Sequence, residues 1–114
     1  MLDELTKRIE ELKNYYDDGT MMSMHESICG IQLCESFLDK IKQIELLDIP
    51  IENKIDLLKE YLNDNKKRFL KMSQGVFLAD VRDGAYLLNT LNEIIEMIGV
   101  IGDVNSHQKS KKSK

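Results

Sequence analysis

The spacing of apolar residues predicts four amphipathic helices joined by short turn-forming segments. Over residues 2–16 the apolar positions advance by alternating steps of three and four residues, which is the a and d spacing of coiled coils and helical bundles. Residues 17–20, Asp-Asp-Gly-Thr, are predicted to end this helix. The apolar positions are Leu2, Leu5, Ile9, Leu12 and Tyr16.

A second helix is expected over residues 21–47. Ser23, followed three residues later by Glu26, forms a possible capping box, so the helix could begin near Thr20 or Ser23. Pro50 disfavours the helical conformation at the residue before it and is predicted to end the segment. A predicted buried stripe of Met24, Ile28, Ile31, Leu38 and Ile41 is broadened by Leu33, Phe37 and Ile44, as expected for a helix with two neighbours.

Two further stripes follow, but their registers disagree. The slip falls at residues 73–75, Ser-Gln-Gly, which favours a break and separate helices over residues 50–72 and 76–101. The alternative is one helix over residues 51–98 with a stutter at Gly75, which would leave three helices in total. The third stripe is Ile55, Leu58, Leu62, Asn65, Phe69 and Met72, and the fourth is Phe77, Val81, Gly84, Leu88, Leu91, Ile95 and Ile98.

These elements predict an all-α fold, a small antiparallel helical bundle occupying residues 1–102 as one domain. Leu, Ile, Val and Phe account for 34 of the 114 residues, enough for a packed core. Gly30 and Gly84 lie inside helical patterns and are expected at close helix–helix approaches, where they could face each other. Residues 103–114 lack an apolar pattern, end in lysines and are expected to form a flexible basic tail.

The net charge of −4 excludes a generally basic nucleic-acid-binding protein. Basic residues nevertheless gather in one cluster, Lys66, Lys67, Arg68 and Lys71. This cluster suits the C-terminal end of a helix, where cations complement the helix dipole. The alternative is phosphate contact by this cluster and the lysine tail, within a complex that handles nucleic acid.

The expected location is the cytoplasm. No apolar run approaches the ~20 residues of a membrane span, and the charged start does not resemble a signal peptide. Cys29 and Cys34 are five residues apart on a predicted helix and point in different directions, which favours free thiols. Two alanines against twelve isoleucines and thirteen lysines are typical of an AT-rich genome.

Candidate chemistry is sparse. His25 and Cys29 are four residues apart on one helix face, a spacing that lets two side chains bind one metal ion, but a closed zinc site needs four ligands. The same pair lacks the orienting third group of a nucleophilic catalyst. No phosphate-binding loop occurs. We therefore expect no catalytic residues, no metal and no cofactor.

The best candidate for partner contact is a group of methionines and tyrosines, because both residue types are common at protein interfaces. The group is Tyr15, Tyr16, Met21, Met22 and Met24.

The leading hypothesis is a non-enzymatic protein–protein interaction module: an inhibitor, adaptor or accessory subunit. Its partner is unknown, and self-association as a homodimer is expected for so small an apolar-striped chain. Size and helix count resemble those of small helical immunity proteins, secretion chaperones and phage inhibitors, a likeness of shape only.

Overall fold

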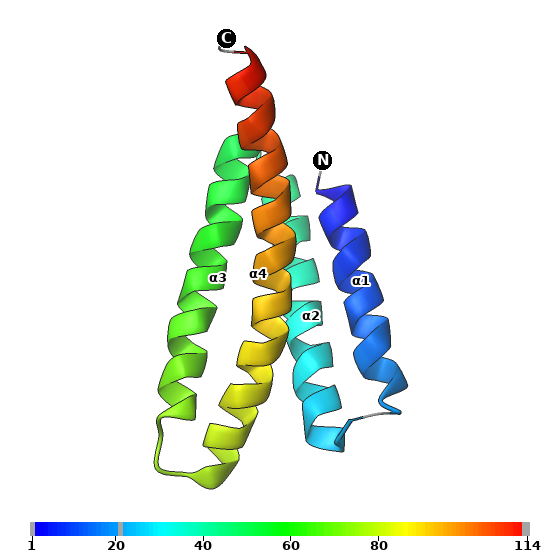
Figure 1. Ribbon diagram of the computed structural model, residues 1–114, viewed down its shortest axis with the longest axis vertical. Coiled ribbons are helices and arrows are strands. Elements are labelled where there is room, and N and C mark those ends of the chain that lie inside the picture. The colour runs from blue at the N-terminus through cyan, green and yellow to red at the C-terminus, as the bar shows by residue number, and fades with distance from the viewer. Residues whose placement is uncertain (1, 21, 113–114) are drawn as a thin grey trace.

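The computed structural model is a bundle of four helices that run alternately down and up (Figure 1). It describes residues 2–20 and 22–112, with side chains through residue 99. The described part contains no strand, so the predicted all-α antiparallel bundle is confirmed. The helices are α1 (Asp3–Asp18), α2 (Met24–Glu45), α3 (Ile51–Ser73) and α4 (Leu78–Lys112).

The helices pair as two hairpins, α1 with α2 and α3 with α4. Between the hairpins the most extensive contact is that of α2 with α4, so these two helices form the centre of the bundle and α1 and α3 flank it. The α1–α2 loop and the α3–α4 turn lie at the same end, at the bottom of Figure 1. We call this the two-loop end.

A glycine and a serine determine how the chain passes from α1 to α2. Gly19 has a positive φ of 61° and its N–H bonds to the Tyr15 carbonyl, which is the usual left-handed end of a helix. Ser23 then caps α2, because its hydroxyl accepts the backbone N–H of Glu26 at 3.2 Å. The cap predicted at Ser23 is therefore confirmed, and the start at Thr20 is not observed.

The chain breaks between α3 and α4, as the disagreement of the two registers predicted. The alternative of one helix over residues 51–98 is wrong. The chain folds back because α4 packs closely against α3. At Gly84 an added Cβ would lie 2.8 Å from the backbone nitrogen of Ser73. By folding back this closely, α4 buries its apolar face against α3 instead of leaving both faces in water.

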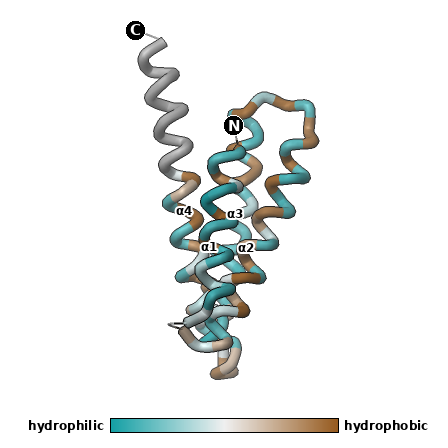
Figure 2. The backbone as a smooth tube through the Cα atoms, turned by 90° about the vertical axis from the view of Figure 1, so that its right-hand side faces the viewer, coloured by the Kyte–Doolittle hydropathy of each residue, from teal (hydrophilic) through white to brown (hydrophobic). Residues whose placement is uncertain are grey.

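The core follows the predicted stripes most closely in α1 and α3. Leu12 and Met72 are half-buried, and the other members of those two stripes are buried, including the polar Asn65. The Asn65 side chain is satisfied because its amide donates to the Tyr61 carbonyl at 2.8 Å. Figure 2 shows the corresponding alternation of hydrophilic and hydrophobic residues along the tube.

Two parts of the predicted stripes are wrong. Met24 and Ile28 are exposed, because the buried face of α2 is rotated about the helix axis toward Cys29, Leu33 and Cys34. Phe77 is also exposed, because it precedes α4 and belongs to the turn. The predicted members Leu33, Phe37, Ile41, Ile44, Leu91 and Ile98 are buried, and the core also contains side chains that were not predicted, namely Cys29 and Cys34 in α2 and Thr90 and Ile94 in α4.

Gly30 and Gly84 do lie at close approaches, but they do not face each other. A Cβ at Gly30 would fall 2.4 Å from the ring of Tyr16, so α1 packs on α2 there. Gly84 instead faces the end of α3. Each glycine therefore allows the two helices of one hairpin to pack closely.

Some expectations fall outside the described residues. The placement of Met21 is not described. α4 continues to Lys112, beyond the end predicted at residue 101, and the side chains of residues 100–114 are not described, so the flexibility of the expected basic tail, residues 103–114, stays a prediction. Among the described residues no helix is long and apolar enough to cross a membrane.

Candidate interaction surface

The structure divides the five residues that the sequence grouped as a partner-contact region. Tyr15 and Met24 are exposed at the two-loop end. Tyr16 is buried, and Met22 is half-buried against the core. Met21 lies outside the described residues. Two of the five are therefore available to a partner in the described structure.

Tyr16 is a packing residue. Its ring fills the space over Gly30, and its hydroxyl lies 2.8 Å from the Thr90 hydroxyl of α4. Burial raises the pKa of the Tyr16 phenol. Since Ser27 of α2 also donates a hydrogen bond to the Tyr16 carbonyl, this residue joins α1, α2 and α4 at the two-loop end.

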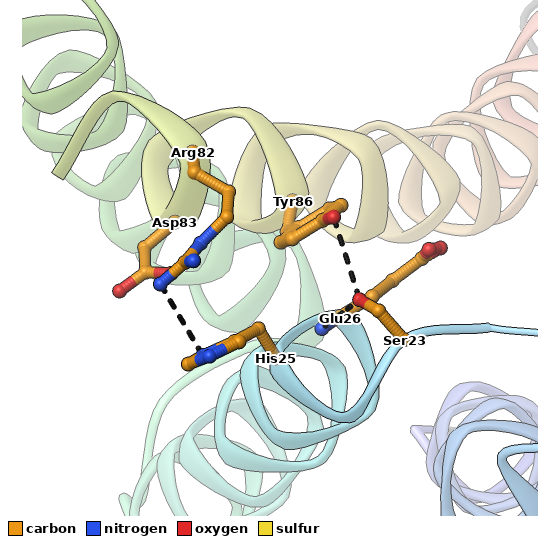
Figure 3. A network of polar contacts seen from close by, with 6 residues as sticks. All are labelled: Ser23, His25, Glu26, Arg82, Asp83 and Tyr86. Carbon is orange, nitrogen blue, oxygen red and sulfur yellow. Dashed lines mark hydrogen bonds and ion pairs between the residues drawn. The ribbon is translucent and has the colours of Figure 1, made fainter. Parts of the chain in front are cut away.

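His25 and Cys29 differ in their exposure to solvent. His25 is exposed, and its Nδ1 accepts a hydrogen bond from the Arg82 guanidinium at 3.3 Å (Figure 3). Arg82 in turn forms an ion pair with Asp83 at 3.4 Å. Beside them, the Ser23 hydroxyl donates to Tyr86 at 3.4 Å, so these contacts link the starts of α2 and α4.

Neither cysteine has the environment of a reactive thiol. Both are free and buried. Burial raises the pKa of Cys29, with the Asp83 carboxylate adding to the effect, and burial raises the pKa of Cys34 to about 12. These shifts disfavour the thiolate, which is the form that attacks substrates and binds metals. No group of three or more His, Cys, Asp or Glu suitable for a metal occurs among the described residues.

The four residues of the predicted basic cluster differ in their contacts. Arg68 donates to the Asn65 side chain at 3.2 Å and lies over the Phe69 ring, so it supports the C-terminal half of α3. Lys66, Lys67 and Lys71 are exposed and form no ion pair with a described residue. Three unpaired cations therefore remain on the outer face of α3.

Sequence reasoning missed the most exposed apolar segment. Val76, Phe77 and Leu78, which we call the apolar tip, are 93%, 73% and 85% exposed where the α3–α4 turn leads into α4. The register analysis placed Phe77 on a helix stripe. The signal that could have found the tip is the Ser-Gln-Gly break, because it leaves the next residues between helices.

Other exposed apolar residues lie toward the two-loop end. Leu70 on α3, Tyr15 on α1, and Met24 and Ile28 on α2 are also exposed there. In Figure 1 the α3–α4 turn extends below the α1–α2 loop, so the apolar tip projects furthest. Leu70 lies among the three unpaired lysines of the same helix. This end therefore combines projecting apolar side chains with free positive charge.

A groove of about 330 Å³ lies between α2 and α3, away from the two-loop end. Two exposed leucines, Leu46 and Leu47, sit in the nearby α2–α3 connection, and Leu47 lines the groove. Hydrophobic residues are visible along this connection in Figure 2. The apolar lining comprises Ile44, Leu47, Leu57 and Tyr61, and the polar lining Lys40, Gln43, Glu60 and Asp64.

Comparison with known proteins adds no relative to this description. No family model, curated protein or solved structure matches the chain.

Proposed function

We propose that the protein is a non-enzymatic protein–protein interaction module, an inhibitor, adaptor or accessory subunit, that binds its partner through the two-loop end. The observation that carries this proposal is the apolar tip, three consecutive large apolar residues that project into water. Large apolar side chains gathered on a projecting surface are typical of interaction sites. The two free thiols support a cytoplasmic location as part of the same proposal.

Affinity capture from the source cells tests this function. The tagged full chain is compared with the double variant Phe77→Ser, Leu78→Ser and with Leu46→Ser as the matched control. All three positions are exposed, so folding should be unaffected. We expect the control to retain the wild-type partner and the double variant to lose it at least tenfold. Equal capture by wild type and the double variant would refute the proposal, as would no capture by any of the proteins.

A second candidate function is supported by Lys66, Lys67 and Lys71, whose charges are exposed and unpaired. In this alternative the cluster and the lysine tail contact phosphate as part of a nucleic-acid-handling complex. Binding to duplex or single-stranded nucleic acid would then weaken steeply with salt and be lost when the three lysines become glutamate. The absence of binding at low salt would reject this alternative.

A further inference from the structure

We propose that the apolar tip docks into the α2–α3 groove of a second copy of this chain, so that copies associate head to tail. This inference rests on the proposed function and names a partner for the same surface. The tip lies at the two-loop end, whereas the groove is lined by residues of α3 and of the C-terminal part of α2, toward the opposite end of the molecule.

The contact must be made between molecules. Tyr61, which lines the groove, and Ser73, which precedes the tip, lie on the continuous helix α3. At a rise of 1.5 Å per residue they are separated by about 18 Å along the helix axis. A tip therefore cannot enter the groove of its own chain without unwinding α3.

The groove suits an aromatic apolar side chain. Its volume of about 330 Å³ exceeds that of one Phe side chain, and Ile44, Leu47, Leu57 and Tyr61 supply apolar surface within its lining. The Tyr61 ring is held in place, edge-on to Phe37 with centroids 5.0 Å apart and its hydroxyl bonded to Ser36. A rigid ring of this kind can form an edge-to-face contact with the incoming Phe77.

Charge favours the head-to-tail arrangement. Residues 39–64, which span the groove, contain seven acidic and four basic residues, and Glu60 and Asp64 line the groove beside Lys40. Residues 65–72, next to the tip, contain four basic residues and none that is acidic. Tip against groove brings opposite charges together, whereas tip against tip would oppose the two basic clusters.

Association of this kind does not close after two copies. Each added copy leaves one tip and one groove free, so the contact is heterologous and the assembly grows with concentration. The contact is small, and interfaces below about 1,200 Å² are typically weak. We therefore expect association that is visible over a concentration series at low ionic strength and not at high dilution.

Sedimentation equilibrium of the full chain measures this growth. The weight-average mass should rise from 13.2 kDa and pass twice that value at the highest concentrations. Phe77→Ser in the tip and Leu47→Lys in the groove should each hold the mass near that of the monomer. The matched controls are Gln74→Ser, an exposed polar position in the same turn but outside the tip, and Leu46→Lys, adjacent to the groove residue but not lining it. Both controls should associate as wild type does.

Mixing the two defective variants separates this arrangement from a symmetric dimer. Phe77→Ser retains its groove and Leu47→Lys retains its tip, so an equimolar mixture should form one contact and stop at about twice 13.2 kDa. A symmetric dimer that survives Leu47→Lys would overturn the inference, and so would a wild-type chain that stays monomeric throughout. A monomer that still captures a different protein through Phe77 would overturn this inference and leave the proposed function standing.

Discussion

The ring of Tyr16 lies directly against Gly30, and its hydroxyl is held by Thr90, so the ring has little freedom to move. Any side chain at Gly30 must displace it. Such overpacking typically costs 1–3 kcal/mol, and an alanine in place of glycine recovers about 1 kcal/mol of helix propensity.

Gly30→Ala should therefore lower the free energy of unfolding by up to about 2 kcal/mol in urea denaturation. Gly99→Ala is the matched control, because Gly99 is exposed in α4 with nothing within 4 Å of an added Cβ. The control should gain up to about 1 kcal/mol. Stabilisation by both substitutions would show that the Tyr16 contact is looser than the structure implies.

Burial of the Cys34 thiol predicts a loss of stability at alkaline pH. Its folded pKa of about 12 is above the ordinary thiol value of 9.0, so folding favours the protonated form. The stabilisation is complete below about pH 9 and is lost as the pH rises toward 12, by up to about 1.4 kcal/mol per pH unit. Tyr16, with its raised pKa, contributes in the same direction above pH 10.

Urea denaturation between pH 8 and pH 11 measures this dependence, with Cys34→Ala as the comparison. The free energy of unfolding of the wild type should fall more steeply above pH 9 than that of the variant. Identical slopes for the two proteins would contradict the assignment to Cys34.

At the scale of the elements, the packing of α4 on α3 depends on Gly84. An added Cβ would meet backbone atoms, Ser73 N at 2.8 Å and Phe69 O at 3.0 Å, which cannot rotate out of the way. Gly84→Ala should thus separate the ends of the hairpin and lower the free energy of unfolding by up to about 2 kcal/mol in urea, after the gain of about 1 kcal/mol in helix propensity is subtracted. Retention of wild-type stability would place the two helices further apart than observed.

The sequence predicted helix number, order and the break before α4, because each rests on local signals such as caps, glycine and the period of apolar residues. It predicted the stripes of α1 and α3 well, since each of these outer helices buries one face. It misplaced the face of α2, which contacts all three other helices, so apolar residues occur on several of its sides. The apolar tip and the groove escaped prediction because exposure depends on where neighbouring helices end.

At the scale of the whole molecule, the exposed apolar residues are distributed unevenly. The two-loop end carries the apolar tip together with Leu70, Tyr15, Met24 and Ile28, whereas the opposite end carries Leu46 and Leu47. Free lysines accompany the first group, while carboxylates outnumber cations around the groove. The two ends of the bundle therefore differ in their exposed apolar residues and in their charge. We propose that the two-loop end binds the partner.

The most direct measurement of this claim is photo-crosslinking inside the source cells. Phe77 is replaced by p-benzoyl-phenylalanine, and Lys7, which is exposed on α1 and belongs to neither the tip nor the groove, carries the same group in the control. We predict a discrete adduct from position 77 and none from position 7, with a mass of about twice 13.2 kDa if the partner is a second copy. No adduct from position 77, or the same adducts from both positions, would contradict the account.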